Sequence, residues 1–76
     1  MEFDGLKLSY AAMVQSVMAL GVSFEDAKRA NEVLSAFCKH LVEGSNALPT
    51  EKEDMKDQID ILKNIQDAEI HDLYKK

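Results

Sequence analysis

The sequence predicts an all-α protein in which a short apolar helix packs on an antiparallel helical hairpin, forming a three-helix bundle. Apolar residues recur with the 3.6-residue period of a helix, and no alternating β-rich run competes with them. Glycine and proline stand between the periodic segments, where helix boundaries are needed. We therefore expect one domain over residues 1–76, with an N-terminal arm at 1–8 and helices at about 9–20, 24–43 and 51–74.

The first expected helix lies in the uncharged run LSYAAMVQSVMALGVSF, residues 8–24. The rest of the chain is rich in charge, since the whole protein is 30% charged and carries a net charge of -5. A helix that is apolar around most of its circumference is buried on several sides. A membrane span would need about 20 predominantly apolar residues, and Gln15 and Gly21 interrupt this run. We expect the run to be covered by protein, either by the fold itself, by a second copy or by a target.

The second expected helix has clear signals at both ends. Gly21 and Gly44 suit the left-handed position just past a helix C-terminus. Ser23 and Asp26 form a variant of the capping box. One face of the helix is apolar and is predicted to face the core: Ala27, Ala30, Leu34, Phe37, Cys38 and Leu41. Asn31 lies at the margin of this stripe, where we expect it to be partly buried and to fix register.

The third expected helix follows Thr50 and Glu53, which match a capping box. Its main stripe should pack on the second helix: Met55, Ile59, Leu62, Ile70 and Leu73. Ile61, Ile65 and Ala68 point about 100° away from that stripe. One neighbour cannot cover both faces, and the first helix is only about half as long as the third. We therefore expect homo-oligomerisation, most simply as a two-fold dimer.

Charge and composition restrict the class of partner. The chain has 14 acidic and 9 basic residues, which disfavours nucleic acid and anionic membranes and favours a partner with a basic surface. The N-terminus MEFDGLKLSY lacks the basic region of a secretory signal. A single cysteine suits a reducing compartment. We expect a cytoplasmic protein.

No pattern of catalysis or metal binding is present in the sequence. One cysteine, Cys38, and two histidines, His40 and His71, cannot complete a tetrahedral zinc site within one chain. The i, i+4 pair Asp67 and His71 is expected to make a surface hydrogen bond, and a half-site shared between subunits is the alternative. The sequence lacks a phosphate-binding glycine loop and a nucleophile elbow. We expect no enzyme activity, no cofactor and no metal.

The segment ALGVSFEDAKRA resembles the helix-turn-helix DNA-binding motif over about 20 residues, because Gly21, Val22 and Ser23 match its turn. The resemblance implies DNA contacts from the 20–32 region. The implied contacts are Ser23, Phe24, Lys28, Arg29 and Glu32. The segment departs from the motif where Ala27 and Ala30 replace larger apolar residues, and the expected recognition helix begins Phe-Glu-Asp.

The function predicted first is non-catalytic binding of another protein by steric occlusion. Such a protein would be a small acidic inhibitor, an antitoxin-like module or an adaptor, a type common in phages and mobile elements. The expected contact residues are Tyr10, Met13, Met18, Ile61, Ile65 and Tyr74. The alternatives are the helix-turn-helix regulator and, third, a small-ligand sensor with a pocket between subunits.

Overall fold

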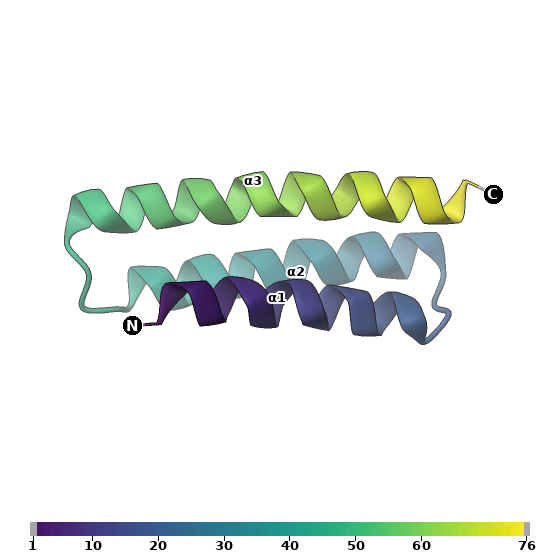
Figure 1. The fold of residues 1–76 in the computed structure, drawn as a ribbon, viewed down its shortest axis with the longest axis horizontal. Helices are drawn as coiled ribbons and strands as arrows, with labels where there is room; N and C mark the ends of the chain where they lie inside the picture. Colours follow the sequence, from purple (N-terminus) through teal and green to yellow (C-terminus); the bar gives the residue numbers. More distant parts are fainter. Residues whose placement is uncertain (1, 76) are drawn as a thin grey trace.

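A computed structural model describes residues 2–75 as three helices packed side by side (Figure 1). α1 spans Phe3–Ala19, α2 spans Phe24–Glu43 and α3 spans Pro49–Tyr74. Consecutive helices run antiparallel, so α1 and α3 point in the same direction (Figure 1). The described residues contain no strand, which confirms the all-α prediction.

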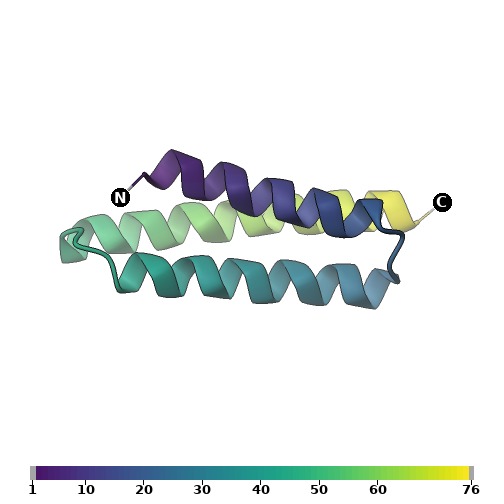
Figure 2. The ribbon, with the colours of Figure 1, turned by 90° about the horizontal axis from the view of Figure 1, so that it is seen from below.

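The bundle is elongated, with extents of 43 × 17 × 17 Å. In the view of Figure 2, α3 lies behind the pair formed by α1 and α2. The ribbons of α1 and α2 are closest near their connecting loop and diverge toward the N-terminus of α1 (Figure 2). None of the helices within residues 2–75 is both long and apolar enough to cross a bilayer.

α1 begins at Phe3, six residues earlier than the sequence predicts, so most of the expected arm is helical. The Leu6 N–H donates to the Glu2 carbonyl, closing the first turn at 3.1 Å. Phe3 and Leu6 pack against the core, and the Lys7 ammonium donates to the Gln58 side chain of α3 at 3.0 Å. These tertiary contacts outweigh the low helix propensity of the glycine at position 5.

The turn from α1 to α2 has the predicted ends. Gly21 has φ +78°, the left-handed conformation that favours glycine after a helix. The Ser23 hydroxyl accepts a hydrogen bond from the Asp26 N–H at 3.1 Å, which caps α2. The two helices then run antiparallel and side by side (Figures 1 and 2), whereas those of a helix-turn-helix motif cross at about 90–120°. The turn therefore joins a helical hairpin.

The connection from α2 to α3 differs from the prediction at both ends. Gly44 has φ -83°, so α2 ends without a left-handed residue. α3 begins at Pro49, which sits at the first helical position. The Leu48 N–H donates to the Glu51 carboxylate at 3.0 Å, so the cap lies two residues before the predicted Thr50–Glu53 box. The fixed φ of proline and its missing N–H suit this earlier start.

The core is small and includes polar positions. Its buried apolar side chains are Tyr10, Val14, Ala27, Cys38, Val42, Ile59 and Ile70. On α2 the buried line also includes Asn31 and Ser35, at 0% and 2% exposure. The residues Phe37, Leu41 and Leu73, which the sequence predicts to be packed, are instead 56%, 40% and 53% exposed. α2 is therefore rotated toward Asn31, because this residue joins a polar network with both other helices.

Candidate functional site

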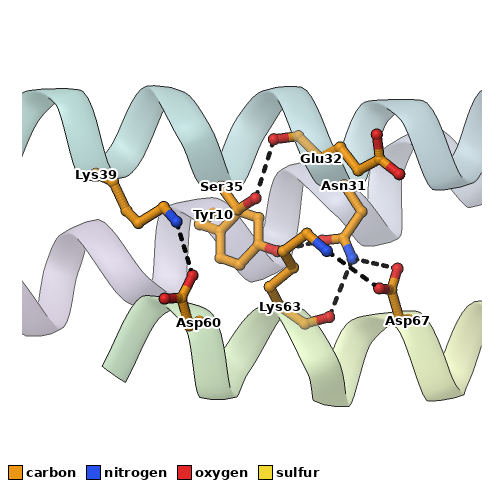
Figure 3. A network of polar contacts seen from close by, with 8 residues as sticks. All are labelled: Tyr10, Asn31, Glu32, Ser35, Lys39, Asp60, Lys63 and Asp67. Carbon is orange, nitrogen blue, oxygen red and sulfur yellow. Dashed lines mark hydrogen bonds and ion pairs between the residues drawn. The ribbon is translucent and has the colours of Figure 1, made fainter. Parts of the chain in front are cut away.

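A hydrogen-bonded cluster at the centre of the bundle ties all three helices together (Figure 3). The Tyr10 hydroxyl of α1 donates to the Asn31 Oδ1 of α2. The Asn31 amide donates to the Lys63 carbonyl at 3.1 Å and to the Asp67 carboxylate at 2.8 Å, both on α3. The Lys63 ammonium pairs with Asp67 at 3.3 Å. No buried side-chain nitrogen or oxygen within residues 2–75 lacks a partner, so the hydrogen-bonding groups of the cluster are satisfied.

Burial of the phenol and the nearby Asp67 carboxylate raise the pKa of Tyr10 from 10.0 to about 12. The hydroxyl therefore stays protonated and serves as a hydrogen-bond donor at neutral pH. A tyrosine acting as a general base would need the opposite shift in pKa. The cluster links all three helices through Tyr10, Asn31 and Asp67.

The described residues form no group of three or more His, Cys, Asp and Glu side chains that could hold a metal ion. Cys38 is buried, and burial raises the pKa of its thiol, which lowers the fraction of reactive thiolate at neutral pH. His71 packs edge-on against Phe24, with ring centroids 4.9 Å apart. Within residues 2–75 the Asp67 carboxylate bonds to Asn31 and Lys63 instead of His71, the partner expected from the sequence.

Many large apolar side chains are exposed on the bundle. The described residues include ten large hydrophobic side chains that are at least 40% exposed, against seven apolar side chains in the buried core. A soluble domain normally scatters such residues singly. Here several of them gather on two surfaces on different sides of the bundle.

The first surface lies between α1 and α2, and we call it the α1–α2 face. It comprises Met13, Ser16, Val17, Ala30, Val33, Leu34, Phe37 and Leu41. A shallow, open hollow of about 450 Å³ is lined by Met13, Val17 and Val33, among others. A second hollow of about 630 Å³ lies beyond Leu41, toward the N-terminus of α1. Phe37 stands one helical turn from Val33, which lines the first hollow, and one turn from Leu41, which lines the second.

The second surface follows the outer side of α3, and we call it the α3 stripe. Its residues recur at helical spacing on one side of α3: Asp54, Asp57, Ile61, Ile65, Ala68 and Asp72. Ile61 and Ile65 are 60% and 51% exposed. Carboxylates stand at both ends of this apolar centre, and Asp54, Asp57 and Asp72 pair with no cation within residues 2–75.

The lysines of α3 are engaged on its α2 side. Lys52 donates to the Glu43 carbonyl at 2.8 Å. Lys56 pairs with the Glu43 carboxylate at 3.1 Å, and Lys63 pairs with Asp67. The positive charges of α3 are therefore directed toward α2, which leaves the α3 stripe acidic.

Three of the contact residues predicted from the sequence are exposed, and the other three are not. Ile61 and Ile65 lie on the α3 stripe, and Met13 lies on the α1–α2 face. The structure thus divides these three residues between two surfaces.

Tyr10 is only 1% exposed, so a partner cannot reach it, and it leaves the candidate contact set. Met18 is partly buried and packs against the core. Tyr74 is also partly buried, and its hydroxyl donates to the Val22 carbonyl at 2.7 Å. Tyr74 therefore fastens the end of α3 to the α1–α2 turn.

The residues of the DNA-binding alternative lie near the start of α2. Ser23 uses its hydroxyl for the cap. The Lys28 ammonium lies 5.5 Å from the centre of the Phe24 ring. Lys28 and Arg29 share a shallow surface depression with Glu25 and Glu32. The two cations are thus interleaved with carboxylates, which weakens the field that a phosphate would meet.

Sequence reasoning missed Val33 as a surface residue and placed Phe37 and Leu41 in the core. The helical spacing of Val33, Phe37 and Leu41 is consistent with either a core stripe or a surface stripe, because both faces of α2 carry small or apolar residues. Asn31 is the one residue in the sequence that could have indicated which face of α2 is buried, because its four donor and acceptor positions need partners inside a protein.

Comparisons of this chain with protein-family models, with curated proteins and with solved structures give no match.

Proposed function

We propose that the protein is a non-catalytic binding module that uses the α3 stripe to cover a basic surface of another protein. The observation that carries this proposal is the pair Ile61 and Ile65, both more than half exposed and flanked by Asp54, Asp57 and Asp72, which make no ion pair within residues 2–75. An apolar centre with a charged rim is the usual composition of a protein interface.

The two parts of the stripe make different contributions to binding. Burying a side chain of this size against a partner contributes roughly 1.5–3 kcal/mol, so Ile61 and Ile65 would supply affinity. The acids Asp54, Asp57 and Asp72 would steer a basic partner and raise the association rate. Because α3 is already a packed helix, its backbone need not order on binding.

Steric occlusion would be the mode of action, as for an inhibitor, an antitoxin-like module or an adaptor. α3 has 26 residues and is about 39 Å long at 1.5 Å per residue. A rod of this length can cover a groove or a basic patch without any reaction. We also expect the chain to self-associate, since a domain of 76 residues buries little surface alone.

The test uses immobilised full-length protein to capture a partner from source-cell lysate, followed by affinity measurement with that partner in purified form. The double variant Ile61→Glu/Ile65→Glu should lower affinity at least tenfold. Leu48→Glu is the matched control, because Leu48 is 63% exposed but lies in the loop before α3. This control should bind as the wild type does.

Salt and charge give a second, independent readout. The association rate should fall as ionic strength rises, and Asp54→Asn/Asp57→Asn should reduce that dependence. A partner that binds the Ile61→Glu/Ile65→Glu variant with unchanged affinity would overturn the proposal.

A further inference from the structure

We propose that the α1–α2 face binds the same face of a second copy of this chain, about a two-fold axis. This surface is separate from the α3 stripe, so the inference does not depend on the proposed binding function. Two-fold interfaces are isologous, which means that a projection on a face must fit a hollow on that same face.

The α1–α2 face carries both parts of such a fit. Phe37 projects with 56% of its surface exposed. One turn away lies the hollow of about 450 Å³ that Met13, Val17 and Val33 line with apolar groups. A two-fold axis between these two features would insert Phe37 of each copy into the hollow of the other. The small residues Ser16 and Ala30, which also line the hollow, leave room for an aromatic ring.

Charge favours a second copy as the occupant. Each chain carries a net charge of -5, so two copies repel each other through most of their surface. α1 has no charged residue from position 8 to its end, and the eight residues of the α1–α2 face are uncharged, although Glu2 lines the second hollow at the N-terminal end. This face is therefore where two acidic chains can approach with the least electrostatic repulsion. A basic partner, by contrast, would gain nothing from its charge here.

The size of the face is adequate for a reversible dimer. The α2 part of the face runs from Ala30 to Leu41, so the face is about 18 Å long, and two helices side by side are about 20 Å wide. The projected area of about 360 Å² is nearly half of the roughly 800 Å² per partner in a standard interface, which suits a weak, reversible contact. The molecule exposes 5072 Å², against about 4,700 Å² expected for a compact monomer of this mass.

Sedimentation equilibrium of the full chain tests the proposal. The wild type should sediment as a dimer of two 8.5 kDa chains at 100 µM or below. Phe37→Glu should give the monomer mass over the same range, and circular dichroism should show an unchanged helix content because Phe37 lies outside the core. Ile61→Glu, an equivalent charge insertion on the α3 stripe, should leave the dimer intact.

Ser16→Glu provides a second route, because it places a charge in the hollow without removing any apolar contact of the fold. It should also give a monomer, even where Phe37→Glu is poorly folded. Amide NMR shifts on dilution should change along the α1–α2 face and stay constant along the α3 stripe. A monomeric wild type at 100 µM would overturn the proposal, leaving the face for a different protein. So would a dimer that Ile61→Glu breaks and Phe37→Glu does not.

Discussion

Tyr10 and Asn31 form the hydrogen bond that joins α1 to α2 at the centre of the bundle (Figure 3). Both residues are essentially inaccessible, at 1% and 0% exposure. The same Asn31 amide reaches α3 through Lys63 and Asp67. A single asparagine on α2 therefore bonds to both neighbouring helices, and with Asn31 facing the core, Phe37 lies at the surface.

Tyr10→Phe should destabilise the fold by about 1–3 kcal/mol, because it leaves the Asn31 Oδ1 buried without a donor. Urea unfolding followed by circular dichroism measures the change. Tyr74→Phe is the matched control, since its hydroxyl bonds to the Val22 carbonyl at a partly buried site and should cost less. Equal losses for the two variants would argue against a special role for the central cluster.

Stability should fall as pH rises from about 10 to 12. The pKa of Tyr10 is raised to about 12 in the fold and is about 10 in the unfolded chain. In this interval the native state retains a proton that the unfolded state releases, so the stabilisation present below pH 10 is lost with rising pH. The loss should approach about 2–3 kcal/mol. Burial of Cys38 raises the pKa of its thiol and acts in the same direction.

The wild type and Tyr10→Phe share every titrating group except the Tyr10 phenol. The difference between their urea midpoints therefore reports how this phenol alone contributes to the pH dependence of stability. That difference should shrink between pH 10 and pH 12. A constant difference over this range would show that the phenol is not protected from ionisation in the fold.

The starts of α2 and α3 give a test by capping variants. Ser23→Ala should cost about 1 kcal/mol, because it removes the acceptor for the Asp26 N–H. At α3, Glu51→Ala should cost about 0.5–1 kcal/mol, since it removes the acceptor of the Leu48 N–H. Thr50→Ala should remain within about 0.5 kcal/mol of the wild type. A larger loss of stability for Thr50→Ala than for Glu51→Ala would instead support the Thr50–Glu53 cap that the sequence predicts.

Local signals explain which parts of the fold the sequence predicts well. The bounds of α2 and the conformation of Gly21 depend on residues within one turn of the boundary, and both are confirmed. The Ile61 and Ile65 side chains were identified as exposed candidates because they fall outside the main stripe of their own helix, which is also a local property.

The remaining features depend on contacts between helices, which no local pattern encodes. α1 extends to Phe3 because Lys7 reaches Gln58, a residue 51 positions away. Asn31 bonds to partners on α1 and α3, so Asn31 and Ser35 face the core. Phe37, which hydrophobic periodicity places in the core, lies at the surface instead. The sequence pattern therefore assigns the α2 part of the α1–α2 face to the core.

Alanine substitution should separate the two glycines that follow helices. Gly21→Ala should cost about 1–2 kcal/mol, because an L side chain is disfavoured at φ +78°. Gly44→Ala should be neutral or slightly stabilising, since its φ is -83° and an added Cβ would lie 3.7 Å from the His40 carbonyl oxygen, an ordinary contact. Thermal unfolding of the two variants measures this contrast. Equal destabilisation would contradict the assigned backbone conformations.

The two surfaces should be separable by one charge insertion on each. Phe37→Glu should abolish dimerisation and leave the intrinsic affinity for a basic protein partner within about twofold, because Phe37 and the α3 stripe lie on different helices. Ile65→Glu should weaken partner binding about tenfold or more and leave the dimer intact. Sedimentation equilibrium reports the first property and titration calorimetry with the purified partner reports the second. If either substitution removed both properties while the fold persisted, dimerisation and partner binding would share one surface, and the division between the α1–α2 face and the α3 stripe would be wrong.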